Sequence, residues 1–391
     1  MELSPTGVSA HRGHWRGTLS LLWHGVRSQE VNIGEVPDGG IGSGETTVDT
    51  ALNRNGRVLI VGPSWVGDMV MAQSLFKTVK AEHPAAHIDV LAPEWTRPLT
   101  ARMPEVADAI SLPLGHGELR LSDRYRLGRS LAAKRYTHSI ILPNSLKSAL
   151  IPYFAGIPRR TGYRGEMRWG LLNDMRRLDR ARAPMTVQRF VALARDSDQP
   201  VHTDFPVPRL EVPKGGLEYA LGKLALQRPK GRVMALCPGA EYGPAKRWPA
   251  EHFVDIAKRK LDQGWAVWLY GSRKDAPVSS EIDRLTGNRC VDLAGRTKLD
   301  EAIDLMSIAD VVVTNDSGLM HVAAALGRKI VALYGSSNAS HTPPISDKAK
   351  VLSLGLSCSP CYKRECPLGH LKCLRDLSPG QVLAAVDELC P

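Results

Sequence analysis

The stretch VLIVGPSWVGDMVMAQSL, residues 58–75, is typical of a buried strand that runs through a glycine-containing turn into a helix. Asp68 stands in the first turn of that predicted helix. A dinucleotide-binding loop needs G-x-G-x-x-G after the strand, and a P-loop needs G-x-x-x-x-G-K-[ST]. Gly62 and Gly67 satisfy neither pattern. The stretch therefore predicts an α/β unit but argues against a nucleotide-binding loop at this position.

Apolar strands and helical segments alternate on both sides of this stretch. The strands of the first unit are RVLIVG, HIDVLA, DAISLP and THSIILP, with helices starting near Gly67 and Leu121. The Pro-rich segment DQPVHTDFPVPRLEVPKG, residues 198–215, interrupts the pattern as a linker. Near-continuous apolar strands separated by helices indicate parallel sheets that are covered on both faces.

The same pattern restarts after the linker. The strands there are RVMALCPG, AVWLYGS, RCVDLAG, DVVVTNDS and KIVALYGS, with helices predicted at 249–263 and 317–326. Ser378 and Pro379 are predicted to begin a closing helix as its N-cap and first residue. We predict an α/β fold of two tandem Rossmann-like, doubly wound domains that face a cleft, over residues 55–205 and 206–391.

Residues 1–54 form a polar, glycine-rich extension that we predict to be disordered or poorly structured. The piece HRGHWRGTLSLLWHGVR, residues 11–27, offers the alternative of a short basic amphipathic helix that touches a membrane. An incorrectly assigned start codon is a further alternative. This segment has no signal-peptide core, and no apolar run in the chain reaches the roughly 18 residues needed to span a bilayer. We expect a cytoplasmic protein.

The chain is basic. Its formal charge of +11 at pH 7 favours an anionic partner, which could be nucleic acid, a membrane surface or a phosphorylated substrate. Between residues 159 and 189 the sequence holds nine arginines and three acidic residues. Such a run is usually a solvated surface, but arginine also suits bidentate capture of phosphate or carboxylate. No zinc-finger, helix-turn-helix or RNP signature accompanies these charges.

Two strand ends in the second domain suit a diphosphate. CPGAEYGPAKRWP, residues 237–249, supplies glycines for close backbone approach and positive charge from Lys246. NDSGLMHVAAALG, residues 315–327, begins a helix whose free backbone N–H groups and dipole favour an anion. Asp316 or Ser317 could equally be a helix cap, and His321 a core histidine. The pair of elements on one sheet edge predicts a nucleotide-diphosphate pocket.

Four of the seven cysteines follow the spacing C-x2-C-x4-C-x6-C near the end of the chain, with His370 inside the run. We predict reduced structural thiols and no bound metal. One zinc ion at Cys358, Cys361, Cys366 and Cys373, with His370 as a possible replacement ligand, is the alternative, although the spacing is not that of paired zinc knuckles.

The chain contains, in this order, the motif around Asp68, PNSLKSAL, GIPRRTGYRGEMRWGLLND, the two diphosphate-suited loops and the cysteine run. Together these motifs resemble the lipopolysaccharide heptosyltransferase family, in particular its heptosyltransferase II branch. The resemblance covers Arg57 to the C-terminus. It implies the glycosyltransferase B fold, with an acceptor-binding first domain and a second domain that binds ADP-heptose. The implied reaction is an inverting, metal-independent heptose transfer to the lipopolysaccharide inner core.

Matched residue by residue, the resemblance makes Asp68 the catalytic base, with a helix cap as the alternative role. Lys246 is predicted to neutralise the departing diphosphate. The full set of predicted donor-binding residues is Gly239, Glu241, Lys246, Gly271, Ser272, Asp316, Ser317, Gly318 and His321. The predicted acceptor-binding residues are Arg120, Arg124, Lys147, Arg164 and Arg168.

These expectations also include a peripheral, monomeric protein at the cytoplasmic face of the inner membrane, without a nucleic-acid partner. Two other functions stay open at this point. A sugar-nucleotide epimerase shares the two-domain architecture but needs no lipid acceptor. A non-enzymatic binder of anionic lipid or nucleic acid would use the arginine-rich stretch and show salt-sensitive binding.

Overall fold

The structure is a computed structural model that describes residues 56–115, 117–196 and 204–391. From Gly56 on, the described residues belong to one compact unit of the chain. The predicted N-terminal extension lies outside the described residues.

The first half of the described chain is built on a parallel sheet with the order β3-β2-β1-β4-β5-β6. Its strands are β1 (Arg57–Val61), β2 (His87–Ala92), β3 (Val106–Ser111), β4 (His138–Ile141), β5 (Arg159–Tyr163) and β6 (Asp174–Arg176). Val58 to Val61 are buried, as expected for a central strand covered on both faces. The order 3-2-1-4-5-6 is that of a Rossmann sheet.

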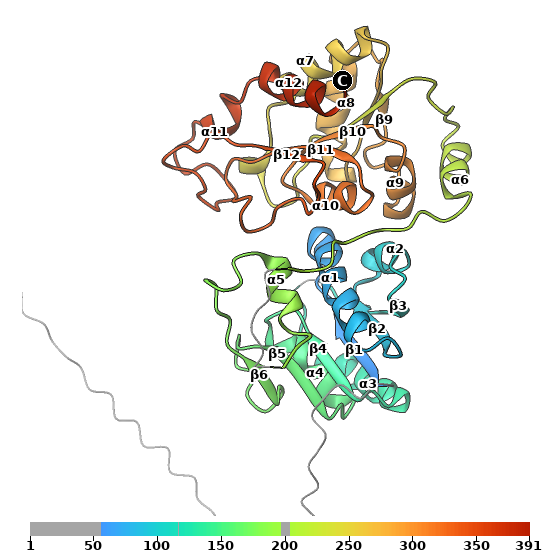
Figure 1. The fold of residues 1–391 in the computed structure, drawn as a ribbon, viewed down its shortest axis with the longest axis vertical. Helices are drawn as coiled ribbons and strands as arrows, with labels where there is room; N and C mark the ends of the chain where they lie inside the picture. The colour runs from blue at the N-terminus through green and yellow to red at the C-terminus, as the bar shows by residue number, and fades with distance from the viewer. Residues whose placement is uncertain (1–55, 116, 197–203) are drawn as a thin grey trace, which may run out of the picture. The chain divides into compact units, whose positions relative to one another are not determined.

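Helices cover both faces of this sheet (Figure 1). They are α1 (Val66–Glu82), α2 (Arg97–Thr100), α3 (Leu121–Leu131), α4 (Leu146–Phe154) and α5 (Thr186–Val191), with 3-10 turns η1 (Glu94–Thr96) and η2 (Ala132–Lys134). One face packs α3 and α4 in a cluster around Leu59, Ile141 and Ile151. The other face packs α1 and α5, whose buried side chains include Phe76 and Val187.

The second sheet repeats the same topology. Its order is β12-β11-β10-β7-β8-β9, all parallel, so its six strands again follow the 3-2-1-4-5-6 order when counted from β7. The strands are β7 (Val233–Cys237), β8 (Ala266–Leu269), β9 (Val291–Asp292), β10 (Val311–Asn315), β11 (Lys329–Leu333) and β12 (Ala349–Leu352). The direction of the strand order reverses between β7 and β10, and ligands of such sheets bind beyond the carboxyl ends at that point.

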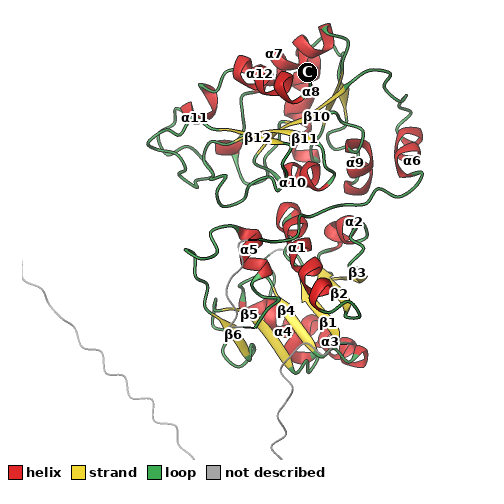
Figure 2. Ribbon diagram, in the orientation of Figure 1, coloured by secondary structure: helices red, strands yellow, loops and turns green. Residues whose placement is uncertain are grey.

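Helices again lie on both faces of the second sheet (Figure 2). They are α6 (Gly216–Lys223), α7 (Ala250–Asp262), α8 (Ala276–Leu285), α9 (Leu299–Met306), α10 (Gly318–Ala325), α11 (Lys372–Arg375) and α12 (Pro379–Leu389), with 3-10 turns η3 (Pro244–Lys246) and η4 (Arg273–Asp275). Trp248, Phe253 and Val386 are in the core between this sheet, α7 and α12. Two parallel sheets with interleaved helices confirm the predicted fold class.

Most predicted elements are present within a few residues of their expected bounds. The helix expected at 249–263 is α7, the one at 317–326 is α10, and Ser378 caps α12 by accepting a hydrogen bond from Gln381 N. Three strands were not predicted, namely β5, β6 and β12. Strands β5 and β6 lie within the arginine-rich stretch, whose charges hide the strand pattern.

The predicted linker is held to α1 over its described residues, which start at Asp204. The Ser74 hydroxyl donates to the Pro206 carbonyl at 2.6 Å, and Gln73 exchanges two hydrogen bonds with the Arg209 backbone, both at 2.8 Å. Leu210 N also donates to the Ala325 carbonyl at the end of α10. The described part of the predicted linker is therefore bound along α1.

Within the described ranges, no helix combines the length and the apolar character that a membrane crossing requires.

Candidate functional site

The reversal point of the second sheet carries a buried ion pair. Lys246 ends the 3-10 turn that follows β7, and Asp316 follows β10 directly. The Lys246 Nζ lies 2.5 Å from Asp316 Oδ2, with side-chain exposures of 19% and 6%. A charged pair at this depth is costly unless each partner is satisfied. The pair lies beyond the carboxyl ends of β7 and β10, where the diphosphate pocket was predicted, and the pocket itself stays a prediction.

Asn315 holds the loop that presents Lys246. This side chain is fully buried, and its Nδ2 donates to the Pro238 carbonyl at 2.8 Å, while its Oδ1 accepts from Trp248 N at 3.0 Å. The amide therefore joins the end of β10 to both ends of the loop after β7. This role of Asn315 is not predictable from the sequence, because only the strand pairing brings these two loops together.

Asp68 is the third residue of α1, and Trp65 is the N-cap of that helix. In the part of the chain that the structure describes, the Asp68 carboxylate accepts no hydrogen bond, so it does not act as a helix cap. Burial raises the pKa of Asp68 to about 6, while the positive charge of Lys246 lowers it and the negative charge of Asp316 raises it. These three charges therefore share one electrostatic environment.

The N-terminal ends of α1 and α10 approach each other through glycines. A Cβ atom at Gly67 would lie 2.6 Å from Cδ2 of His321, and one at Gly318 would lie 2.9 Å from Cβ of Val66. Both glycines therefore make room for the facing helix, and the predicted contact of Gly318 with the donor stays a prediction.

His321 is buried one turn into α10, with 5% of its surface exposed. Burial lowers its pKa to about 4, an effect that Asp316 opposes and Lys246 reinforces. The imidazole is therefore neutral near pH 7. A neutral ring can donate a hydrogen bond to an anionic oxygen without adding charge to the site.

Two predicted donor-binding glycines surround a carboxylate that was not predicted. A Cβ at Gly239 would lie 2.4 Å from Oδ1 of Asp275, and one at Gly271 would lie 2.7 Å from its Cβ. Asp275 accepts hydrogen bonds from Ser272 N at 2.9 Å and from Ser272 Oγ at 2.7 Å. Asp275 therefore fills the space beside Gly239, and the predicted contact of Gly239 with the donor stays a prediction. The side chain of Glu241 is exposed, and its carboxylate pairs with the Lys274 ammonium group at 2.5 Å.

Two of the predicted acceptor-binding arginines are buried and hold backbone carbonyls. Arg124 is 3% exposed and donates to the carbonyls of Leu119, Lys147 and Glu118. Arg168 is 1% exposed and donates to the Pro143 and Tyr163 carbonyls. Both guanidinium groups therefore hold the backbone of the loops after β3, β4 and β5 in place. Their contact with an acceptor stays a prediction.

The other three predicted acceptor-binding residues are more accessible. Arg164 is exposed, Lys147 is partly exposed at the first turn of α4, and Arg120 is exposed before α3. Arg120 Nε lies 2.6 Å from Asp123 Oδ2, so part of its charge is already compensated. The structure does not test whether any of the three contacts an acceptor.

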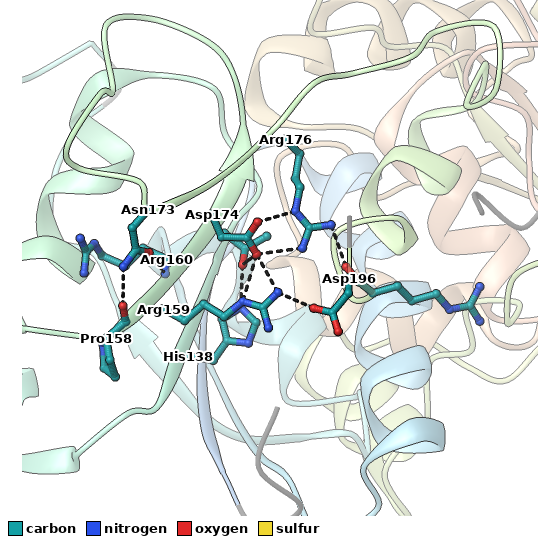
Figure 3. Close-up of polar contacts among 10 residues, drawn as sticks. His138, Pro158, Arg159, Arg160, Asn173, Asp174, Arg176 and Asp196 are labelled. Atoms are coloured by element: carbon teal, nitrogen blue, oxygen red, sulfur yellow. Dashed lines mark hydrogen bonds and ion pairs between the residues drawn. The ribbon is translucent and has the colours of Figure 1, made fainter. Parts of the chain in front are cut away.

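Two other arginines of the basic stretch neutralise one carboxylate, Asp174 (Figure 3). Arg159 lies 2.9 Å and Arg176 2.6 Å from its oxygens, and these contacts outweigh burial to hold the pKa of Asp174 well below its usual range. Thr161 also donates to Asp174 at 2.8 Å and accepts from His138 Nε2 at 2.7 Å. This part of the stretch is therefore a structural network on β4, β5 and β6.

The four C-terminal cysteines line one small cavity together with His370. All four are free thiols, and the backbone amide of Leu371 is the main cause that lowers the pKa of Cys366. Within the described ranges, no three histidine, cysteine or acidic side chains form a group that could hold a metal ion. The absence of a bound metal stays a prediction.

Two sheets of Rossmann topology with charged groups at the strand ends define an α/β protein of the glycosyltransferase B class. The family model for glycosyltransferase family 9 (heptosyltransferase) matches residues 124–372. Lipopolysaccharide heptosyltransferase 2 of Escherichia coli K12 is 48% identical over 344 residues, which cover 85% of this chain and 98% of that protein. The chain belongs to glycosyltransferase family 9.

Other comparisons agree with this assignment. Lipopolysaccharide heptosyltransferase 2 of Salmonella typhimurium is also 48% identical, over 85% of this chain and 98% of its own length. The solved structure of Escherichia coli ADP-heptose lipopolysaccharide heptosyltransferase II matches with a TM-score of 0.77 and 45% identity, over 85% of this chain and 98% of that chain. The fold class and the family predicted from sequence are therefore confirmed.

Proposed function

We propose that this chain transfers L-glycero-D-manno-heptose from ADP-heptose to the first heptose of the lipopolysaccharide inner core, heptosyl-Kdo2-lipid A, with inversion. The observation that carries the proposal is the placement of Asp68 beside the Lys246–Asp316 pair at the ligand edge of the second sheet. The 48% identity to a lipopolysaccharide heptosyltransferase 2 over 98% of its length supports the choice of sugar and acceptor. It also disfavours an epimerase or a non-enzymatic lipid binder.

Asp68 acts as the general base in this proposal. Its carboxylate takes the proton from the acceptor hydroxyl while that oxygen bonds to the anomeric carbon of the donor. The bond from this carbon to the β-phosphate oxygen breaks on the opposite side, and ADP leaves with the electron pair. A pKa of about 6 leaves Asp68 mostly ionised near pH 7.5, yet basic enough to accept the proton.

Lys246 stabilises the negative charge that develops on the β-phosphate. Asp316 holds the ammonium in place before the donor binds, and in the complex it can also position the donor heptose. The backbone N–H groups of Ser317 and Gly318 at the start of α10 add donors for the same phosphate. Neutral His321 supports them, so the site stabilises the leaving group through its own charges and dipoles.

The remaining donor contacts are assigned to the loops after β7 and β8. We place the adenosine near Gly271 and Ser272, where Asp275 fixes the turn. Gly239 and Glu241 belong to the loop that carries Lys246, so they complete the donor pocket. Arg164, Lys147 and Arg120 are the accessible cations that we assign to the acceptor.

The proposal also includes the setting of the reaction. The acceptor is an anionic lipid, and a basic protein that works as a peripheral monomer at the cytoplasmic face of the inner membrane suits such a substrate. We propose that no metal takes part in transfer and that nucleic acid is not a partner. Chelation with EDTA is then expected to leave the transfer rate unchanged.

The test is incubation of the protein with ADP-heptose and heptosyl-Kdo2-lipid A, read by mass spectrometry. Addition of one heptose is the expected result, and the Asp68→Asn variant is expected to bind ADP-heptose but to lose transfer. Donor conversion without a change in the lipid mass would point to an epimerase instead. Normal turnover by Asp68→Asn would remove this residue from the role of base.

A further inference from the structure

His341 lies in the loop after β11, next to the strand that carries Asp316. Its backbone N–H donates to the Asn338 carbonyl at 3.0 Å, and its own carbonyl accepts from Thr186 N, at the start of α5, also at 3.0 Å. These two bonds fix the position of the residue. The side chain is partly exposed, so a ligand can reach the ring.

Arg189 of α5 determines which nitrogen of this ring carries the proton. Its Nη1 lies 2.6 Å from His341 Nε2. A guanidinium group can only donate, so Nε2 is the acceptor and the neutral ring carries its proton on Nδ1. Arg189 itself is held by the carbonyls of Ala183 and Pro184, at 2.9 Å and 2.8 Å. The tautomer therefore follows from a rigid contact.

The charges around the ring are mostly positive. Among the largest charge effects on the ring from the described residues, Arg189 on α5, Arg180 in the segment before α5 and Lys246 after β7 act as cations, and Asp316 at the end of β10 acts as a carboxylate. Burial is the main cause that lowers the pKa of His341, and the two arginines add to it. The imidazole is thus kept neutral beside the Lys246–Asp316 pair. An excess of positive charge at this place favours an anionic ligand.

Among the described residues, the His341 ring is hydrogen-bonded only to Arg189, and this bond is at Nε2, so Nδ1 has no partner there. We infer that His341, oriented by Arg189, is a further substrate-binding residue that donates from Nδ1 to an anionic oxygen of a substrate. This inference rests on the proposed function, which supplies two sources for that oxygen. One is the diphosphate of the donor, and the other is a carboxylate or phosphate of the acceptor.

The test compares His341→Ala with His341→Gln, because glutamine can accept from Arg189 through its oxygen and donate through its nitrogen. ADP affinity is measured by titration calorimetry, and kcat/KM for the acceptor is measured at saturating donor. His341→Ala is expected to lose about 10- to 100-fold in one of the two, as for a hydrogen bond to a charged group. His341→Gln is expected to recover most of that loss.

The two measurements identify the source of the oxygen. A loss in ADP affinity assigns it to the donor, and a loss confined to acceptor kcat/KM assigns it to the acceptor. The inference is overturned if His341→Ala changes neither, or if His341→Gln is as impaired as His341→Ala. If the wild-type protein transfers no heptose while its ADP affinity still depends on His341, the proposed function fails and the inference stands.

Arg189→Met provides a second test that does not need the alanine variant to fold. Without Arg189, the pKa of His341 rises, so the ring gains a proton as the pH falls from 7 to 5. Relative to an Arg189→Met/His341→Gln double variant, the single variant is expected to gain ADP affinity over this range if the donor supplies the oxygen, and to lower its KM for the acceptor if the acceptor does. Identical pH profiles of the two variants in both measurements would overturn the inference.

Discussion

The pH dependence of transfer tests the role of Asp68 most directly. The base must be ionised to accept a proton, so kcat/KM is expected to rise with pH through the pKa of Asp68, about 6. One unit below a pKa, about one carboxyl group in eleven is ionised. We therefore expect kcat/KM at pH 5 to be about a tenth of its plateau value.

The midpoint of this profile depends on two neighbouring charges. Lys246 lowers the pKa of Asp68, so Lys246→Met is expected to move the acid limb to higher pH. Asp316 raises it, so Asp316→Asn is expected to move the limb to lower pH. Both variants are also expected to reduce the plateau value of kcat/KM, because they alter the predicted phosphate site. The pH at the midpoint of the profile does not depend on the height of the plateau. Lys246→Arg is the control, since it keeps the positive charge.

The assay is the initial rate of heptose transfer at low substrate between pH 4.5 and 8.5, followed by mass spectrometry. ADP affinity over the same range separates ionisation of the donor from ionisation of the enzyme. A wild-type kcat/KM that stays near its plateau down to pH 4.5, as for an aspartate with the ordinary pKa of 3.8, would refute the raised pKa. Coincident midpoints for the wild type and Lys246→Met would refute the electrostatic coupling.

Three further outcomes follow from the geometry of the site and the network. Lys246→Ala is expected to weaken ADP binding about tenfold or more in calorimetry, because a charge-assisted contact to phosphate is lost. Gly67→Ala is expected to cost about 1–3 kcal/mol in urea unfolding, since the new Cβ would lie 2.6 Å from the His321 ring. Burial lowers the pKa of His138 to about 3 against 6.5 for the free side chain, so the folded state resists its protonation. The stability due to the neutral ring is complete above pH 6.5 and is lost as the pH falls, by roughly 2 kcal/mol at pH 5. His138→Gln is expected to lose less stability than the wild type between pH 7.5 and pH 5.

The apolar strands made the fold predictable. Strands such as β1 and β10 are near-continuous apolar runs between helices. Few folds other than a parallel sheet covered on both faces accommodate this pattern. Strand β5 was missed because its sequence RRTGY begins with two arginines. Those arginines are compatible with the sheet because Arg159 meets Asp174 and Arg160 donates to the Leu171 carbonyl. These partners stand elsewhere in the sequence, and the composition of the stretch does not show that they meet the two arginines in the folded chain.

Among the charged site residues, the Lys246–Asp316 contact was predictable from the sequence, whereas the surroundings of the arginines were not. Lys246 and Asp316 follow strands that parallel pairing brings together, so their contact followed from topology. The acceptor arginines were chosen from a run of positive charge, and the run does not distinguish a side chain that faces ligand from one that binds carbonyls. Arg168 was chosen on this basis and is buried, whereas Arg189, which orients His341, was not chosen.

The glycines show that a close approach indicated by the sequence can have more than one physical cause. A glycine beside a predicted site residue indicates a close approach, but the approaching group can be a ligand or another part of the chain, and the sequence does not distinguish the two. At Gly67 and Gly318 the approaching groups are His321 and Val66. Removing two Cβ atoms lets the ends of α1 and α10 come together, and this contact brings Asp68 within electrostatic reach of Lys246. A side chain at Gly67 would therefore act on catalysis through the spacing of the two helices, even without touching the sugar.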